Sequence, residues 1–224
     1  MRTDISIAST HGSLRAAFKE GGDHRRAVVI LHEWWGINEN IVQWVDRFAE
    51  AGFAAIAPDL YGGQIARTAT EAEKLMHALD WDRALEQIAS TVKWIGQSSK
   101  GGRRAVGTVG FCMGGALALA SACAIESIQA TVAFYGIPPL PYQQWRELSG
   151  PVQAHFSTQD EWAKADTARQ IQQQCKDAKK TFELFVYDAP HAFMNASRPE
   201  VYNPACAKIA WKRTVDFFEA HLNP

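Results

Sequence analysis

A glycine-rich turn at residues 109–115 places a cysteine where a catalytic nucleophile would stand. The segment Val109-Gly110-Phe111-Cys112-Met113-Gly114-Gly115 follows the apolar run 105–109, typical of a buried strand, and precedes a run of helix formers at 116–120. A strand that turns into a helix at Gly-x-nucleophile-x-Gly is a nucleophile elbow, in which small residues let the backbone fold back beneath one exposed side chain. N–H groups at the start of that helix would favour a thiolate and a developing oxyanion. The alternative is that Cys112 is a small apolar residue in a strand–helix turn.

A cysteine nucleophile needs a base, and the base needs a group that fixes its tautomer. Asp160 follows a predicted strand at 152–156, and His191 follows the next predicted strand at 181–187. Taken singly, the aspartate could be a cap and the histidine an ordinary loop residue. The chain order nucleophile, acid, histidine is that of α/β-hydrolases, and it predicts a triad of Cys112, Asp160 and His191.

The other acids and histidines are assigned more ordinary positions. Asp188 is expected to shape the turn before His191, and His155 is expected to pack within a strand. His32 ends a predicted central strand and is a candidate for a minor part in the site. The remaining histidines are expected at the surface: His11, His24, His77 and His221. No His, Asp or Glu cluster has metal-ligand spacing and no glycine pair matches a phosphate-binding pattern, so no metal and no cofactor are expected.

Strands and helices alternate along the chain. The expected strands are 2–8 and 14–19, forming an edge hairpin, then 27–31, 53–57, 105–109, 130–135, 152–156 and 181–187. The expected helices follow the cap Asn38 as far as Gly52, cover 70–79 and 81–95, begin at the elbow, and cover 161–178 and 204–221. Gly101-Gly102 is expected to turn, while 137–151, with one helical turn around Trp145, and 188–203 are expected loops.

This alternation predicts an α/β fold with a mostly parallel central sheet and helices on both faces, and the chain order of the predicted triad is that of the α/β-hydrolase fold. Sites in such sheets lie beyond the carboxyl ends of the strands. The residues with unusual chemistry fall at those ends: Glu33, Cys112, Asp160 and His191.

Composition limits the partners and the setting. The 224 residues are 47% hydrophobic, and a single domain, 1–224, is expected. With 23 basic and 24 acidic side chains, neither nucleic acid nor an anionic membrane is an expected partner. The four cysteines form no CxxC pair and the start of the chain lacks a signal-peptide core, so a cytoplasmic monomer or small homo-oligomer is expected.

Over nearly its full length the chain resembles the dienelactone hydrolase (carboxymethylenebutenolidase) family, which has the α/β-hydrolase fold. The resemblance rests on five segments: His32-Glu33-Trp34-Trp35-Gly36 with Asn38, Ala57-Pro58-Asp59-Leu60-Tyr61-Gly62, Gly110–Gly115, Asp160, and His191-Ala192-Phe193. A cysteine in the elbow together with glutamate after the first central strand is specific to this family. The resemblance implies that Cys112, Asp160 and His191 form the triad and that Glu33 meets the cysteine in the resting enzyme. It also implies that the N–H groups of Trp34 and Met113 form the oxyanion hole.

The sequence departs from the family at the residues that hold a substrate carboxylate. Family members use arginines, one of them four residues after the catalytic histidine, where this chain has Asn195. Arg198 lies further along and is a candidate, whereas Arg67 and Arg83 are weaker ones, with Arg83 expected to be a solvated surface residue. The candidate aromatic pocket residues are Trp34, Trp35, Tyr135, Trp145 and Phe193.

The predicted function is therefore hydrolysis of a small-molecule ester or enol-lactone through a thioester on Cys112. One alternative is a general carboxylesterase or thioesterase without lactone preference. A second is a non-catalytic binding protein on a hydrolase scaffold, because fold does not imply function. Glu33 has two interpretations as well: it opposes ionisation of a neighbouring thiol through like charge, or it caps the helix that begins near Asn38.

Overall fold

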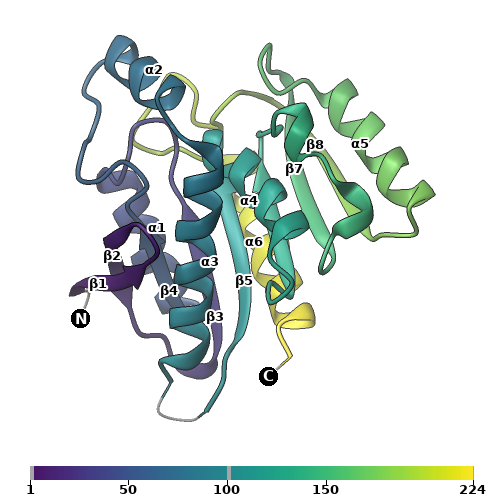
Figure 1. Ribbon diagram of the computed structural model, residues 1–224. Helices are drawn as coiled ribbons and strands as arrows, with labels where there is room; N and C mark the ends of the chain where they lie inside the picture. The colour runs from purple at the N-terminus through teal and green to yellow at the C-terminus, as the bar shows by residue number, and fades with distance from the viewer. Residues whose placement is uncertain (1–2, 100–101, 224) are drawn as a thin grey trace.

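The computed structural model describes residues 3–99 and 102–223, which fold around one eight-stranded sheet (Figure 1). The strands are β1 Thr3–Ser9, β2 Gly12–Lys19, β3 Asp23–Leu31, β4 Phe53–Pro58, β5 Ala105–Phe111, β6 Ala130–Phe134, β7 Val152–Gln159 and β8 Phe182–Pro190. Their order in the sheet is β1-β2-β4-β3-β5-β6-β7-β8. The β1–β2 and β2–β4 pairs are antiparallel and all other pairs are parallel, which confirms the predicted mostly parallel sheet.

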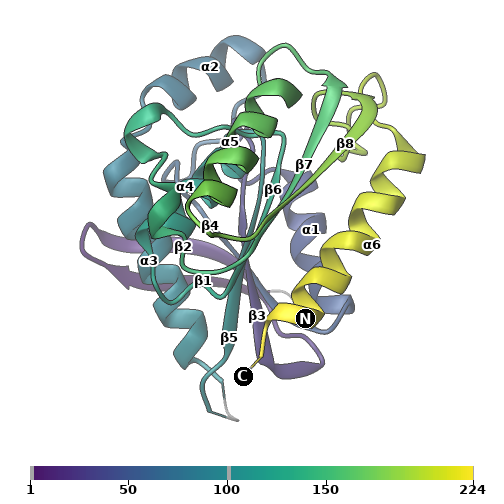
Figure 2. The ribbon, with the colours of Figure 1, turned by 90° about the vertical axis from the view of Figure 1, so that its right-hand side faces the viewer.

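Helices cover both faces of the sheet, as predicted (Figure 2). They are α1 Glu39–Glu50, α2 Ala69–His77, α3 Trp81–Gln97, α4 Met113–Ala124, α5 Ala165–Asp177 and α6 Pro204–His221, with short 3₁₀ turns at Leu140–Tyr142 and Trp145–Glu147. α1 and α6 lie on one face, and α3, α4 and α5 lie on the other. No helix of the described ranges is both long and apolar enough to cross a membrane.

The central strand β3 shows how the sheet builds two cores. Val28 and Ile30 face the core with α1 and α6, whereas Ala27, Val29 and Leu31 face the core with α3 and α4. All five side chains are fully buried. A strand covered on both faces reads as a continuous apolar run, which is why this strand is recognisable from sequence.

Side-chain caps fix the starts of α1 and α3. Asn38 accepts a hydrogen bond from the Ile41 N–H at 3.2 Å, and Asp80 accepts one from the Arg83 N–H at 3.1 Å. The predicted cap of α1 and the predicted break near Asp80 are thus confirmed. Each cap satisfies a backbone donor that the first helical turn leaves without a partner.

Strands β7 and β8 extend further than predicted, to Gln159 and Pro190 rather than to about 156 and 187. They pair with each other to the end, with Gln159 opposite Pro190 after a register shift. Pairing partners are invisible in the local pattern, so the sequence underestimates both strands. The consequence for the site is direct, because Asp160 and His191 become the first residues beyond two adjacent strand ends.

Helix α5 begins at residue 165, later than the predicted 161. The Oδ1 atom of Asp160 accepts the N–H groups of Trp162 and Ala163, both at 2.9 Å, and this holds 160–163 as a turn. An aspartate that bonds its own downstream backbone competes with the helix. Among the other predicted features, Arg2 of the edge hairpin and Gly101 of the turn lie outside the described residues.

Candidate active site

The elbow forms where β5 ends and α4 begins. Cys112 lies between them with φ 56° and ψ −117°, a left-handed conformation rarely adopted by a side-chain-bearing residue. Its N–H donates to the Phe134 carbonyl at 3.0 Å, and its carbonyl accepts from the Ala116 N–H at 3.1 Å. A Cβ added at Gly114 would collide with the backbone of Leu31. Glycine there lets the first turn of α4 press against the end of β3.

The register of the sheet brings a second segment to the elbow. β3 and β5 are parallel neighbours with Leu31 opposite Gly110. Two residues further on, Glu33 and Cys112 leave the same edge of the sheet together. The loop after β3 and the start of α4 are therefore adjacent.

Asp160 and His191 are hydrogen-bonded to each other. The Asp160 Oδ2 atom lies 2.6 Å from His191 Nδ1, and the aspartate side chain is fully buried. Both carboxylate oxygens are thus in use, since Oδ1 holds the 160–163 turn. This contact assigns the proton to Nδ1 and leaves His191 Nε2 as the outward atom, which is buried and has no hydrogen-bond partner among the described residues.

The pKa of His191 lies well above its ordinary value. Burial favours the neutral ring, but Asp160 and the neighbouring Cys112 sulfur favour the charged ring and outweigh it. A protonated imidazole beside a cysteine stabilises a thiolate.

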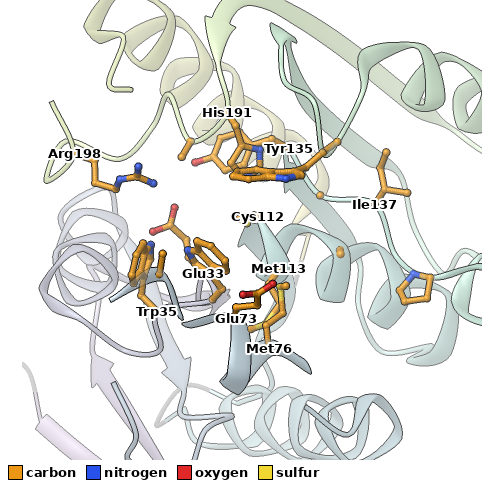
Figure 3. A pocket seen from close by; sticks show the side chains of 18 of the residues that line it. Glu33, Trp35, Glu73, Met76, Cys112, Met113, Tyr135, Ile137, His191 and Arg198 are labelled. Atoms are coloured by element: carbon orange, nitrogen blue, oxygen red, sulfur yellow. The ribbon is translucent and has the colours of Figure 1, made fainter. Parts of the chain in front are cut away.

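These residues meet in a cavity of about 510 Å³ (Figure 3). Figure 3 shows His191 and Tyr135 over Cys112, with Glu33, Trp35 and Arg198 on one side and Met113, Glu73 and Met76 below. Trp34 also lines it. Seven predicted site residues thus share one cavity with His191: Glu33, Trp34, Trp35, Cys112, Met113, Tyr135 and Arg198. Asp160 lies behind His191, outside the wall.

Glu33 is a buried carboxylate, 2% exposed. Its Oε2 atom accepts from Asn195 Nδ2 at 2.8 Å and from Asn40 Nδ2 at 3.4 Å. Burial raises its pKa to about 7, against the opposing influence of His191, Arg198 and the two amides. The carboxyl group therefore holds its proton to a higher pH than an ordinary glutamate does.

The hydrogen bonds of Glu33 go neither to the Cys112 thiol nor to the start of α1. Its partners in the described part of the chain are two amides, so the expected contact with the Cys112 thiol is not formed here. A buried carboxylate requires good donors, and a thiol is a weaker donor than an amide. Glu33 does not cap α1 either, because Asn38 does.

Backbone strain is concentrated around the cavity. Four non-glycine residues of the described ranges have positive φ, and three of them line the cavity: Cys112, Tyr135 and Ala192. Left-handed backbone at such residues is costly and is typically retained where a functional geometry requires it.

Two aromatic side chains enclose His191. The Tyr135 ring centroid lies 4.9 Å from the imidazole and that of Trp162 lies 5.1 Å from it, nearly perpendicular to the ring. Trp162 is 74% exposed yet lines the cavity, and the sequence did not single it out. Trp162 reaches the site because it lies in the turn held by Asp160. The feature of the sequence that could have indicated this is a tryptophan two residues after the predicted triad aspartate.

Two predicted pocket aromatics belong to the core instead. Phe193 is fully buried and packs edge-on against Tyr135 at 5.5 Å, on the side away from the cavity lining. Trp145 is 6% exposed and packs in the core cluster. Both positions correct the sequence interpretation. The direction of the backbone decides whether an aromatic side chain near a strand end points into the core or into the cavity.

Arg198 is the one lysine or arginine among the described residues that line the cavity. Its Nε atom donates to Glu200 at 2.8 Å, and its guanidinium lies 5.9 Å from the Trp35 ring. Arg67 and Arg83 are exposed and lie outside the lining. Asn195 occupies the position of a family arginine and donates a hydrogen bond to the Glu33 carboxylate. Its residue type alone did not predict this contact.

The remaining polar residues have structural positions. His155 is buried between Tyr187 and Gln153, and burial lowers its pKa to about 3. Asp188 lies within β8, not in a turn, and accepts bonds from Thr158 and Gln159. His11, His24 and His77 are exposed as expected, whereas His221 is half-buried and packs 4.7 Å from the Phe217 ring. In the described ranges, no three His, Cys, Asp or Glu side chains could hold a metal ion together.

The mostly parallel sheet, the elbow and the residues beyond the carboxyl ends of β5, β7 and β8 define an α/β-hydrolase. A family model described as the dienelactone hydrolase family matches residues 15–222. The chain is 32% identical over 204 residues to the protein usf of Aquifex pyrophilus, covering 87% of this chain and 88% of that one. It is 31% identical to a putative carboxymethylenebutenolidase of Aquifex aeolicus, covering 88% of each chain.

Solved structures agree. The crystal structure of a putative dienelactone hydrolase from Klebsiella pneumoniae superposes with a TM-score of 0.88 at 25% identity, covering 99% of each chain. The chain therefore belongs to the dienelactone hydrolase family and is an enzyme, a carboxylic ester hydrolase.

Proposed function

We propose that this enzyme hydrolyses small esters or enol-lactones by covalent catalysis, with Cys112 as nucleophile, His191 as base and acid, and Asp160 as the group that orients His191. The observation that carries the proposal is the placement of His191. Its Nδ1 is held by a buried carboxylate at 2.6 Å, its Nε2 has no hydrogen-bond partner among the described residues, and the residue lines the same cavity as the elbow cysteine.

In the first half of the cycle the Cys112 thiolate attacks the carbonyl carbon and the carbonyl electrons move to oxygen. The N–H groups of Met113, at the first turn of α4, and of Trp34, after β3, stabilise that oxyanion. Collapse breaks the ester C–O bond and expels the alcohol or enolate oxygen, which takes the Nε2 proton of His191. A thioester on Cys112 remains.

In the second half neutral His191 removes a proton from water, and the resulting hydroxide adds to the thioester carbon. Collapse expels the Cys112 thiolate and releases the carboxylic acid. His191 again carries its proton, which its raised pKa favours. The cysteine suits substrates with good leaving groups, because a stabilised enolate needs little acid assistance.

Glu33 is proposed to restrain the reactivity of Cys112. A carboxylate at this edge of the sheet opposes the thiolate when charged, and its pKa of about 7 makes that opposition vary near neutral pH. The hydrogen bonds from Asn40 and Asn195 hold the carboxylate beside the elbow without closing on the sulfur. Movement of Glu33 when substrate enters would remove the opposition.

The second candidate is a general carboxylesterase or thioesterase. It is favoured by the cavity lining, in which Arg198 is the one described lysine or arginine and is already paired with Glu200. A substrate carboxylate could bind Arg198 only by sharing it with Glu200. This weakens the case for dienelactone as the preferred substrate, but it does not affect the case for ester hydrolysis.

A substrate panel with cysteine variants tests the proposal. Rates on dienelactones, simple lactones and activated aryl esters distinguish the two substrate classes. Cys112→Ala should abolish turnover of every substrate that the wild type hydrolyses, whereas Cys123→Ala, Cys175→Ala and Cys206→Ala should retain most of it. Full turnover by Cys112→Ala would refute the mechanism.

A further inference from the structure

We infer that His32 is a positioning residue for the oxyanion hole: its Nδ1–H fixes the peptide between Glu33 and Trp34, whose N–H is one of the two donors. The inference rests on the proposed function, since it assigns a further residue to the same reaction. His32 does not line the cavity and acts only through the backbone of its neighbours.

The Glu33 carbonyl is held from two sides. It lies 2.7 Å from His32 Nδ1, and it accepts the N–H of Gly36 at 3.2 Å. No described peptide bond is cis, and in a trans peptide the C=O and the N–H point in opposite directions. Fixing the carbonyl of Glu33 on one side therefore aims the Trp34 N–H to the other side.

The state of the imidazole is determined by its surroundings. A carbonyl only accepts, so Nδ1 must carry the proton. His32 is 0% exposed and burial lowers its pKa, which keeps the ring neutral. Nε2 is then a bare lone pair, in agreement with its being buried without a hydrogen-bond partner in the described part of the chain. The ring makes one bond, and that bond is to the oxyanion-hole peptide.

The same cluster also supports the second donor. The Tyr61 ring lies 4.9 Å from that of His32, and the Tyr61 hydroxyl donates to the Met113 sulfur at 3.1 Å. Tyr61 is 7% exposed, and its own N–H is held by Asp59 at 3.1 Å. One buried pair thus serves both proposed donors: His32 holds the peptide that carries the Trp34 N–H, and Tyr61 contacts the side chain of Met113.

Three substitutions separate the Nδ1 bond from packing. In His32→Asn the amide nitrogen takes a place close to that of Nδ1 and retains the donor. In His32→Gln the amide reaches instead toward the place of Nε2, where no partner exists. His32→Leu removes both donors and keeps an apolar side chain.

The readout compares reactions that do and do not need the oxyanion hole. Ester turnover and binding of a trifluoromethyl ketone, whose adduct carries an oxyanion, need it. Alkylation of Cys112 by iodoacetamide needs the thiolate but forms no oxyanion. We expect kcat to fall by about 10²-fold in His32→Leu and His32→Gln, with KM little changed, weaker ketone inhibition and an alkylation rate within about twofold of wild type. His32→Asn should retain kcat within about tenfold.

Wild-type kcat in His32→Leu, or equal loss in His32→Asn and His32→Leu, would overturn the inference. So would a parallel loss of alkylation, which would indicate general damage to the site. If the variants do not fold, ¹⁵N NMR of the wild-type imidazole decides: a neutral Nδ1–H tautomer is expected at neutral pH, and an Nε2–H tautomer contradicts it. Failure of the proposed function itself would be seen elsewhere, as turnover that survives Cys112→Ala.

Discussion

At the scale of single residues, the site combines one strong charge pair with one restrained carboxylate. Asp160 and His191 are joined at 2.6 Å in a buried setting, where a charge-assisted hydrogen bond is strong. Glu33 directly follows His32. Burial raises its pKa to about 7, against the opposing influence of two amide donors. Activity and stability should therefore respond to these three groups in different ways.

Asp160 and His191 should behave as a unit in mutant kinetics. Because Asp160 acts through the ring of His191, the double variant His191→Ala/Asp160→Ala should be little slower than His191→Ala alone. Steady-state rates of the four proteins in this cycle measure the coupling. Two large defects that simply multiply would assign the residues separate roles.

Glu33 should make the protein less stable as pH rises. Its folded pKa of about 7 lies above the ordinary value of 4.5, so the folded state binds more protons between these pH values and loses stability across that window. Glu33→Gln lacks this loss, and its free energy of unfolding relative to wild type should improve by on the order of 3 kcal/mol between pH 4.5 and pH 8. Urea unfolding at both pH values measures it. A difference independent of pH would show that Glu33 is not a neutral buried acid at low pH.

At the scale of elements, the close contact of α4 with the end of β3 positions the elbow. Gly114→Ala would place a methyl group against the Leu31 and His32 backbone, so α4 must shift. We expect a loss of about 1–3 kcal/mol in stability, together with a larger loss of kcat than stability alone explains. Gly22→Ala, where an added Cβ meets nothing within 4 Å, is the matched control. Wild-type kcat in a folded Gly114→Ala protein would contradict this account of the elbow.

Helix α2 provides a second acidic residue of the cavity, in addition to Glu33. Glu73 is exposed on a helix that buries only Ala72, and its carboxylate opposes anionic substrates at the end of the cavity away from Arg198. Glu73→Gln should raise kcat/KM for an anionic ester several-fold relative to a neutral one, and the gain should shrink at high salt. Glu219→Gln on α6 removes the same charge away from the site and should leave the ratio unchanged. An equal gain in both variants would mean that net charge, not Glu73, sets the selectivity.

At the scale of the whole molecule, the sequence predicted the features that local pattern encodes. Buried strands such as 27–31 and the glycine-rich elbow can be recognised from sequence, because each is marked by a short run of characteristic residue types. Asp160 and His191 were expected near each other because strand ends mark where sites lie in parallel sheets, and the structure joins them by a hydrogen bond.

Features that depend on tertiary contacts were not predicted. The partners of Glu33, Asn40 and Asn195, come from α1 and from a distant loop. Trp162 reaches the cavity because of a turn that replaced the predicted helix start, and Phe193 turned into the core rather than the pocket. The bond from Asn195 to Glu33 joins segments that are remote in the chain, whereas the turn that places Trp162 is a local contact that competes with the start of a helix.

The central claim is a thioester on Cys112, and trapping it is the most direct test. His191→Ala retains the nucleophile but lacks the base for deacylation, so rapid mixing with an excess of activated aryl ester should leave the acyl group on the protein. Mass spectrometry of the peptides should find one acyl group, on Cys112, released by hydroxylamine, and Cys112→Ala should acquire none. An acyl group on any other residue, or an unmodified Cys112 in a variant that still cleaves the ester, would contradict the account.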